Sequence, residues 1–419
     1  MSRRRGGRNN RRKNEPVENN PEFEPNWEEH VEDFEDMNLK PELVHGIFSY
    51  GFKNPSDIQS LAIKPITEHR NVIAQAQSGS GKTGAFGIGI LNNLDLTSQT
   101  TQALILAPTR ELATQTHDFM TDIGNKMKNL SINLFIGGYQ QAEDQAKAQR
   151  RPHVAVCTPG RAYDLIQSNS LSMQNLKMVC LDEADALLGE DFLEDIQQIF
   201  QYLPPDVQIL LFSATIPQSI FNLMMDFMKD PVKILVKAEQ LTLEGIHQFF
   251  VNVGETNYKL PTLIDIFGRL AIQKAVIFAN SKATVDFLKE QMENQHFVVS
   301  AIHAKMTQKD RDQIMHNFRV GASRVLIATD LIARGIDVQS VTLVFNFELP
   351  GNVETYLHRI GRSGRYGRKG IAINIVDKTE IKQLKYIERF YQTTIDELPE
   401  DIASYVNDAN AQFNDDDKQ

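Results

Sequence analysis

Apolar residues along the chain gather in short runs rich in β-branched side chains, and amphipathic stretches separate these runs. The runs are NVIAQ at 71–75, ALILAPT at 103–109, HVAVCTP at 153–159, MVCLDEAD at 178–185, QILLFSAT at 208–215, KAVIFAN at 274–280, VVSAIHA at 298–304, RVLIATD at 324–330, LVFNFELP at 343–350 and GIAINIV at 370–376. Short apolar strands that alternate with amphipathic helices are typical of a parallel sheet covered by helices. Because the pattern occurs in each half of the chain, we predict an α/β protein with two lobes.

Polar stretches set the expected boundaries of these lobes. The stretch 237–246 lies between the two sets of strands and suits a short flexible linker. Residues 1–33 hold a basic block and then an acidic block with little apolar content, so we expect a disordered tail. Residues 406–419 are expected to form an acidic tail. The lobes are therefore predicted at 34–236 and 247–405.

Composition and charge restrict the function further. The chain has 419 residues, enough for two domains, and its net charge is −10. Residues 1–13 carry seven basic side chains and no acidic one, so the remainder has a charge of −10 − 7 = −17. A body this acidic cannot attract nucleic acid by its overall field. Any nucleic-acid partner would need local contacts from backbone amides and a few arginines.

Neither a membrane span nor a disulfide is expected. The sequence has no run of about 18 apolar residues and no apolar stretch after its basic start, so we predict no transmembrane helix and no secretory signal. Cys157 and Cys180 both lie inside apolar runs, which favours two reduced thiols in the core. Such thiols suit the cytosol or the nucleus.

The first strand leads into a phosphate-binding loop. Its residues are Ala76, Gln77, Ser78, Gly79, Ser80, Gly81, Lys82 and Thr83, with Ala76 where the first glycine of the P-loop pattern usually stands. Small residues let backbone N–H groups point at phosphate oxygens, Lys82 reaches the β- and γ-phosphates, and the Thr83 hydroxyl can ligate Mg²⁺. Gly79, Gly81 and Gly84 also fit a dinucleotide fingerprint. That reading lacks the acidic residue expected about 20 positions later.

An acidic partner for this loop follows about 100 residues later. Asp182 ends a fully apolar strand and is placed to hold Mg²⁺ through water. Glu183 is the candidate base that polarises the attacking water. Open α/β sheets bind their ligands beyond the carboxyl ends of their strands, where both carboxylates stand. The residues thus predict a nucleoside triphosphatase (NTPase) with Mg²⁺ as its cofactor.

Asp182-Glu183-Ala184-Asp185 spells DEAD, and with the neighbouring motifs the chain resembles the DEAD-box RNA helicase family. The resemblance spans roughly residues 34 to 400. It implies two tandem RecA-like lobes joined by a short flexible linker, and an ATP-dependent RNA helicase that closes around single-stranded RNA and opens short duplexes. Within the family the chain is most similar to the members that act in translation initiation, through FEDMNL at 34–39 and LTLEGI at 241–246.

The resemblance also assigns an ATP site and its coupling residues. Gln59, in the segment 51–59, would read the adenine edge, and an amide can pair in bidentate fashion with adenine. The other residues implied in nucleotide binding and catalysis are Phe34 and Phe52 at the base, Asp337 at the ribose, and Arg362 and Arg365 as arginine fingers beside Lys82 and Glu183. The residues implied in coupling hydrolysis to strand separation are Asp185, Ser213, Thr215 and His358.

A further set of residues at strand ends is implied in RNA binding. They are Pro108, Thr109, Arg110, Gly138, Thr158, Arg161, Arg311 and Thr329. Hydroxyls, amides and arginines grip phosphates and sugars without reading sequence. The RNA target therefore stays open.

Several alternatives remain at the level of the sequence. The catalytic residues would look the same in an ATP-gated RNA clamp of an exon-junction-type assembly or in an mRNA-decay helicase. A DNA translocase is a third alternative. GEDF at 189–192 has an acidic residue where the family pattern has a basic one, which affects partner surfaces. We expect a monomer in the cytoplasm, or in the nucleus, with RNA and initiation-factor scaffold proteins as partners.

Overall fold

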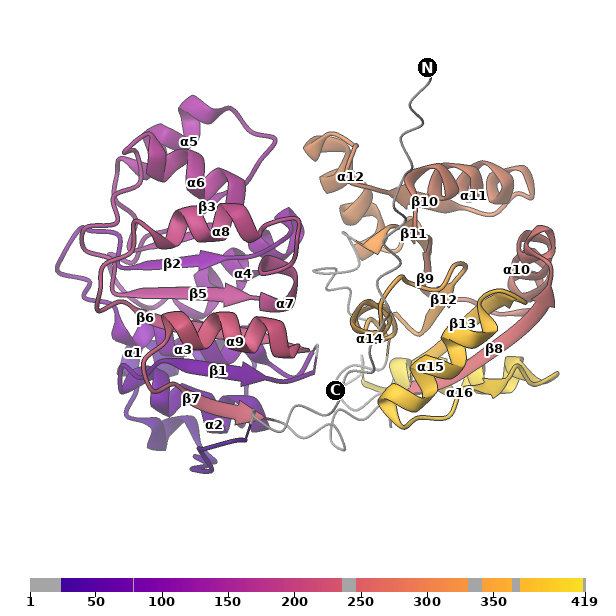
Figure 1. Cartoon of the computed structure of the whole chain (residues 1–419), viewed down its shortest axis with the longest axis horizontal. Coiled ribbons are helices and arrows are strands. Elements are labelled where there is room, and N and C mark those ends of the chain that lie inside the picture. Colours follow the sequence, from indigo (N-terminus) through magenta and orange to yellow (C-terminus); the bar gives the residue numbers. More distant parts are fainter. Residues whose placement is uncertain (1–23, 78, 236–245, 331–340, 364–369, 417–419) are drawn as a thin grey trace, which may run out of the picture.

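The computed structural model describes residues 24–77, 79–235, 246–330, 341–363 and 370–416, with side chains to residue 410. Two bodies stand side by side in it (Figure 1). We call the body up to residue 235 lobe one and the body from residue 246 onward lobe two. The predicted linker, apart from residue 246, lies outside the described residues.

Each lobe contains one parallel sheet. Within the described residues both sheets have seven strands, in the orders β3-β4-β2-β5-β6-β1-β7 and β10-β11-β9-β12-β13-β8-β14. The strands of lobe one are β1 (Val72–Gln75), β2 (Ala103–Leu106), β3 (Ile132–Phe135), β4 (Val154–Cys157), β5 (Met178–Asp182), β6 (Gln208–Ser213) and β7 (Val232–Leu235). Those of lobe two are β8 (Ile246–Gly254), β9 (Ala275–Phe278), β10 (Val299–Ile302), β11 (Val325–Ala328), β12 (Leu343–Asn346), β13 (Gly370–Asp377) and β14 (Asp396–Glu397). The predicted fold class, two tandem parallel-sheet lobes, is confirmed.

Helices cover both faces of each sheet (Figure 1). In lobe one they are α1 (Pro41–Tyr50), α2 (Asp57–Thr67), α3 (Lys82–Asn93), α4 (Arg110–Ile123), α5 (Gln141–Ala148), α6 (Pro159–Gln167), α7 (Ala184–Leu187), α8 (Leu193–Phe200) and α9 (Gln218–Phe227), with a 3₁₀ turn at Phe34–Met37. In lobe two they are α10 (Lys259–Arg269), α11 (Lys282–Asn294), α12 (Gln308–Arg319), α14 (Val353–Ile360), α15 (Ile381–Tyr391) and α16 (Ile402–Asp416), with a 3₁₀ turn at Thr256–Tyr258. Each lobe thereby buries its own apolar core on both sides of its sheet.

Helices that follow strands directly present their first turns at the cleft between the lobes. In lobe one, three residues separate the end of β2 from the start of α4, and the Thr109 hydroxyl accepts a hydrogen bond from the Leu112 amide. In lobe two, Thr307 caps α12 in the same way. Hydroxyls at this position satisfy amides that the first helical turn leaves without a partner. The caps therefore fix where the residues of α4 and α12 lie along the cleft.

The ends of the chain are more ordered than the sequence pattern indicates. Residues 24–33, part of the predicted tail, lie along lobe one, where the Asn26 side chain accepts from the Lys233 amide at 2.6 Å and donates to the Pro231 carbonyl. The predicted acidic tail at 406–419 starts inside helix α16. Cys157 and Cys180 are buried and free, as predicted. No helix among the described residues is long and apolar enough to cross a membrane.

Candidate functional site

A cavity of about 1000 Å³ lies between the lobes. The phosphate loop, the carboxyl end of β5 and the first turn of α3 form its floor on lobe one, and Arg319 and Arg362 reach it from lobe two. Small-molecule sites are concave pockets of this size, with a few polar groups that converge on the ligand. The predicted nucleotide site therefore coincides with a cavity that both lobes build.

The phosphate loop uses backbone conformations that glycine adopts without strain. Gly79 and Gly81 have φ angles of +84° and +101°. Helix α3 starts at Lys82, whose ammonium is 6% exposed and donates to the Ala76 carbonyl at 2.9 Å. Ser78 lies outside the described residues. A helix N-terminus behind a glycine turn is a favourable place for a phosphate.

Gln59 connects helix α2 to the phosphate loop. Its side-chain oxygen accepts from the Ser56 amide at 3.0 Å, and its nitrogen donates to the Gly81 carbonyl at 3.2 Å. A Cβ atom at residue 84 would lie 2.3 Å from that nitrogen, so the close approach of α2 to α3 requires Gly84. The residue predicted to read adenine therefore also holds the loop predicted to bind phosphates.

Two phenylalanines predicted at the adenine base have different positions. Phe52 lines the cavity, whereas Phe34 is fully buried with its ring centroid 6.1 Å from that of Phe52. Tyr50 and Phe119 pack against other sides of the Phe52 ring. Phe34 thus supports Phe52 from behind, and Phe52 is the ring that can stack on a base.

Asp182, the last residue of β5, and Glu183, the next residue, are both buried, but their pKa values shift in opposite directions. Burial, and after it the charge of Glu183, raises the pKa of Asp182 to about 7. Burial also acts on Glu183, but the positive charge of Lys82, 3.9 Å away, and then that of His358 outweigh it and lower the pKa of Glu183. Glu183 is therefore an ionised carboxylate, as a general base must be.

The backbone at Glu183 is strained. Its φ and ψ are 52° and 56°, a left-handed conformation that costs of order 1–3 kcal/mol for a residue other than glycine. Such conformations cluster at functional sites, where the surrounding structure enforces them. Here the conformation ends β5 and turns the chain into α7, so that Glu183 faces the cavity while Asp185 faces lobe two.

Asp185 accepts hydrogen bonds from both lobes. The hydroxyls of Ser213 and Thr215 donate to it at 2.9 and 2.8 Å from lobe one. His358 Nε2 lies 2.9 Å from Asp185 Oδ2 and comes from helix α14 of lobe two. The four residues predicted to couple hydrolysis to strand separation are therefore in one hydrogen-bonded cluster.

Arg362 and Arg359 lie on one side of lobe two but have different surroundings. Arg362 lines the cavity, and its Nε donates to the His358 carbonyl. Arg359 is fully buried and donates to Asp330, Asn346 and Asn280, and to the carbonyl of residue 348. Arg359 was not among the residues predicted from the sequence. The available signal was its place next to His358 in an amphipathic helix, which could have indicated a role at the site. Asp337 and Arg365 lie outside the described residues.

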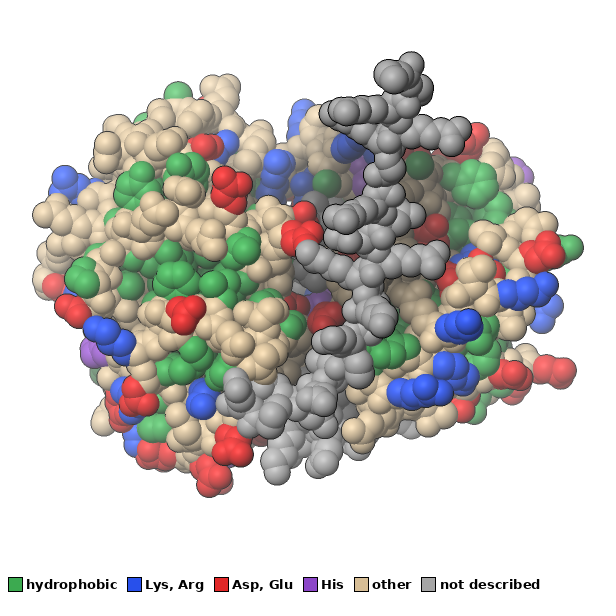
Figure 2. Space-filling model, in the orientation of Figure 1, with side chains coloured by type: hydrophobic (Ala, Val, Ile, Leu, Met, Phe, Trp, Pro, Cys, Tyr) green, Lys and Arg blue, Asp and Glu red, His purple; other side chains and the backbone are tan. Residues whose placement is uncertain are grey.

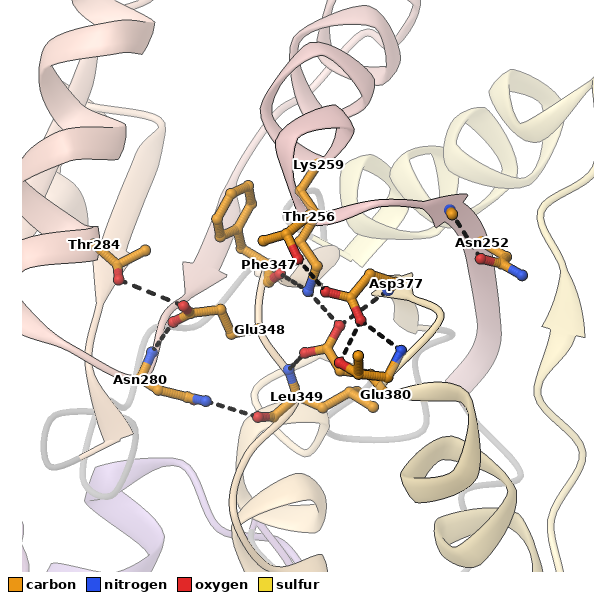
Figure 3. A network of polar contacts seen from close by, with 12 residues as sticks. Asn252, Thr256, Lys259, Asn280, Thr284, Phe347, Glu348, Leu349, Asp377 and Glu380 are labelled. Atoms are coloured by element: carbon orange, nitrogen blue, oxygen red, sulfur yellow. Dashed lines mark hydrogen bonds and ion pairs between the residues drawn. The ribbon is translucent and has the colours of Figure 1, made fainter.

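Polar contacts around residues 347–349 form a network in lobe two, and Arg359 joins it through the Glu348 carbonyl. Figure 3 shows the contacts of Lys259, Asn280, Glu348 and Glu380 in this network. Glu348 accepts from the Asn280 amide at 2.6 Å, and the Lys259 ammonium, 1% exposed, donates to the Phe347 carbonyl at 3.0 Å. Lys259 also pairs with Glu380. Residues 347–348, whose Glu348 carbonyl accepts from Arg359, are thus bonded to Lys259 on one side and to Asn280 on the other. These bonds hold α14 in place against the sheet.

A second contact joins the lobes away from the cavity. Arg311 of α12 pairs with Glu111 of α4 at 2.6 Å, with the two side chains 4% and 6% exposed. Beside them, Arg110 Nη1 donates to Gln308 Oε1 at 2.9 Å. Arg311, predicted to bind RNA, therefore has a buried carboxylate partner, and Glu111 is a functional candidate that the sequence analysis passed over.

The remaining residues predicted to bind RNA vary in exposure. Pro108 and Thr109 are buried, whereas Thr158 and Thr329 are half-buried at the ends of β4 and β11. Arg161 pairs with Asp144 and donates to the Tyr139 carbonyl at 3.1 Å. The glycine at 138 has φ +97° and packs against the Arg110 guanidinium. RNA binding at these positions stays a prediction.

Comparison with known families and proteins fits this geometry. Residues 56–223 match the DEAD/DEAH box helicase family, and residues 258–367 match the helicase conserved C-terminal domain. ATP-dependent RNA helicase eIF4A of Schizosaccharomyces pombe is 49% identical over 384 residues, which cover 92% of this chain and 98% of that protein. Eukaryotic initiation factor 4A of Drosophila melanogaster is 51% identical over 393 residues, covering 93% and 97%.

Solved structures with ligands resemble the whole described chain. Saccharomyces cerevisiae Dbp5 bound to RNA and ADP BeF3 has a TM-score of 0.84 and 31% identity, covering 90% of this chain and 99% of that one. Mss116p bound to ssRNA and AMP-PNP has a TM-score of 0.81 and 28% identity, covering 92% and 84%. The arrangement of the two lobes thus resembles that in structures of proteins bound to RNA and a nucleotide analogue.

Proposed function

The chain belongs to the DEAD/DEAH box helicase family, and from this premise we propose that it opens short RNA duplexes by closing its two lobes around ATP and one RNA strand. The observation that carries the proposal is the contact between His358 and Asp185, 2.9 Å apart across the cleft. Asp185 is two residues from the candidate base Glu183. Any change in lobe closure therefore reaches the carboxylates at the nucleotide site directly.

The base and phosphates of ATP find separate groups on lobe one. Phe52 stacks on adenine and Gln59 pairs with its edge, which would make the enzyme prefer ATP to GTP. Lys82 and the amides of the phosphate loop hold the phosphates. Because lobe one supplies all these groups, ATP should bind before the lobes close.

Asp182 and Thr83 fit a magnesium ion. The Oδ2 atom of Asp182 is buried and has no hydrogen-bond partner among the described residues, and Thr83 lines the same cavity. Carboxylate and hydroxyl oxygens are ligands that Mg²⁺ accepts, commonly together with substrate phosphates. When bound, Mg²⁺ would neutralise charge on the phosphates.

Hydrolysis needs groups from both lobes. Glu183 takes a proton from the attacking water, while Arg362 reaches the cavity from lobe two and Arg365 is proposed to act beside it. Arginine fingers are typically worth 10³–10⁵ in rate. With the lobes apart, turnover would therefore be nearly absent. Closure would also bend the bound RNA strand and displace its complement, without a need to move along the duplex.

The cellular role follows from the relatives named above. Proteins named eIF4A match this chain at about 50% identity over more than nine-tenths of its length. This supports a role in translation initiation, in which the enzyme opens structure in the 5′ region of mRNA together with a scaffold initiation factor. It further supports action in the cytoplasm.

The proposal is tested with the full-length protein. ATP turnover is measured with single-stranded RNA, with DNA of the same sequence and without nucleic acid, and unwinding is measured on a short RNA duplex. We expect stimulation by RNA only, and Arg362→Ala should remove the stimulation while ATP still binds. Equal stimulation by DNA would contradict RNA specificity, which depends on the 2′-hydroxyl.

Two further measurements separate the helicase from its alternatives. A clamp would hold RNA and ATP in a long-lived complex with a single turnover, whereas a helicase turns over many times. The role in initiation is tested by adding the protein to a translation extract depleted of its own eIF4A. We expect it to restore translation of an mRNA with a structured 5′ region, and failure to do so with an active helicase would contradict this role.

A further inference from the structure

Tyr139 is an aromatic residue exposed at the point where the lobes meet. It follows the glycine turn at 137–138, and half of its side chain (50%) is open to solvent. Its carbonyl accepts from Arg161 Nη2 at 3.1 Å, and the left-handed φ of Gly138 fixes the turn before it. The backbone that carries the ring is therefore held although the ring is open.

The Tyr139 hydroxyl reaches across the cleft. It donates to Asp312 Oδ2 of α12 at 3.4 Å, a long contact from one lobe to the other. Asp312 also accepts from Gln308, which accepts from Arg110. Burial, then the charge of Asp312, raises the pKa of Tyr139, so the hydroxyl stays a donor. The orientation of the ring is therefore set only when α12 lies next to lobe one.

The backbone that carries the ring contacts two arginines, while the hydroxyl of the ring faces the carboxylate of Asp312. Arg161 contacts the carbonyl of that backbone, and the Arg110 guanidinium packs against the two glycines before the ring. Figure 2 shows Lys and Arg side chains at the upper end of the cleft, between the elements labelled α6 and α12 in Figure 1. Arginines beside an open aromatic face form the arrangement with which proteins bind single strands, by contacts to phosphates and by base stacking.

We propose, on the premise that this face binds RNA, that Tyr139 is a stacking platform for one unpaired base of the bound strand, and that lobe closure orients the ring through Asp312. Every base has a π-face, so this contact adds affinity without selecting sequence. Purines offer the larger face and should bind more tightly. The ligand class is a nucleobase of single-stranded RNA, which distinguishes this site from contacts that grip only the phosphate backbone.

The test compares Tyr139→Ala and Tyr139→Phe in the full-length protein. Binding of a labelled oligoadenylate is measured by fluorescence anisotropy in the presence of ADP–BeF₃, next to an oligonucleotide of the same length that has no bases. Stacking is worth roughly 1–3 kcal/mol per base, so we expect Tyr139→Ala to weaken oligoadenylate binding by about 5- to 150-fold. Tyr139→Phe keeps the ring but loses the hydroxyl that bonds to Asp312, so its loss of affinity should be smaller than that of Tyr139→Ala and similar to that of Asp312→Asn. Tyr202→Ala, another exposed tyrosine of lobe one (45%), is the matched control.

The oligonucleotide without bases decides whether stacking is the cause. Tyr139→Ala and the unchanged protein should bind it equally. An equal loss of affinity for both oligonucleotides would overturn the proposal, because Tyr139 would then act only by positioning protein groups. No loss of affinity for either oligonucleotide would also overturn it. If the unchanged protein binds no RNA, the proposed function fails, which is a different result from normal RNA binding that Tyr139→Ala leaves intact.

The role of closure has its own readout. The loss caused by Tyr139→Ala should be larger with ADP–BeF₃ than with ADP, since only the closed lobes place Asp312 at the hydroxyl. The same loss with both nucleotides would overturn the link to closure. Asp312→Asn removes the charged acceptor and should lower affinity with ADP–BeF₃ while it leaves affinity with ADP unchanged. An equal effect in both states would count against the link as well.

Discussion

At the nucleotide site the lobes join through His358 and Asp185, whereas at the contact of α4 with α12 they join through Arg311 and Glu111. All four side chains are buried, but only the first contact includes a carboxylate that also bonds to Ser213 and Thr215 beside the candidate base. The second is an ion pair between an arginine and a glutamate. One contact can therefore respond to the state of the nucleotide, whereas the other lies outside the lining of the cavity.

The arginine–glutamate contact is imperfectly satisfied. Within the part of the chain that the structure describes, Glu111 Oε1 and Arg311 Nε are buried and have no hydrogen-bond partner. Taking two charges out of water costs several kcal/mol each, and their attraction offsets this only when the remaining atoms also find partners. A pair with atoms left over adds little net stability to the closed state. This allows the lobes to separate once the nucleotide contact is lost.

The largest expected effect removes chemistry and leaves both contacts in place. Glu183→Gln keeps size and burial but cannot take a proton, so RNA-stimulated ATP turnover should fall by roughly 10²–10⁴. The complex with ATP and RNA should still form and persist. Turnover and RNA retention are measured together, with Glu190→Gln, an exposed acid nearby, as the control. Near-normal turnover would assign the base elsewhere.

Breaking the arginine–glutamate contact should disfavour closure. Arg311→Ala leaves Glu111 buried without its partner, a loss of about 3–5 kcal/mol in the closed state. The RNA concentration for half-maximal ATP turnover should rise by about two orders of magnitude or more, with ATP affinity unchanged. Lys309→Ala, an exposed cation on the same helix, is the control. A response to RNA like that of the unchanged protein would show that this pair does not hold the lobes.

The two contacts can be distinguished by a double-mutant cycle. Asp185→Asn and His358→Ala share one hydrogen bond, so their effects on RNA-stimulated turnover should be non-additive by about 0.5–3 kcal/mol. His358→Ala and Arg311→Ala have no common partner, and their effects should add. Additivity in the first pair, or strong coupling in the second, would contradict the division into two separate contacts.

The smallest effect tests lobe two away from both contacts. Hydrogen bonds from Thr256, and then from Thr379, lower the pKa of Asp377 from 3.8 to about 2. A carboxylate with a lowered pKa stabilises the fold above its unfolded pKa, and the effect is lost as pH falls through the folded pKa. Asp377→Asn should therefore destabilise the protein at pH 6 and much less near pH 2–3. Urea unfolding across this range measures it, and a constant difference would contradict the assignment.

The sequence predicted ten of the fourteen described strands, including the edge strand β10, and missed β3, β7, β8 and β14. β5 and β6 are buried on both faces, so they appear as continuous apolar runs. β3 and β7 are edge strands. β3 is half exposed at three of its four residues and β7 at alternate residues, so their apolar pattern is weaker and did not distinguish them from loops. β8 carries His247, Gln248 and Asn252, which hides it in the same way.

For the site, motifs predicted residues that line the cavity, but not those that act through partners far away in sequence. The phosphate loop is local, and eight adjacent residues specify it. The partner of Arg311 is 200 residues away, and nothing in either segment indicates that two opposite charges will be buried together. Arg359 was hidden for a related reason, because an arginine on a helix looks exposed until the sheet residues that surround it are known.

One consequence follows from the way residues 24–33 lie on lobe one. Asn26 bonds to both sides of the start of β7, the last strand before the chain leaves for lobe two. A label attached at residue 24 is thus carried by lobe one and moves together with the phosphate loop when the lobes open and close. A fluorophore fused there, paired with one on α15, would record opening and shutting in real time without touching either ligand.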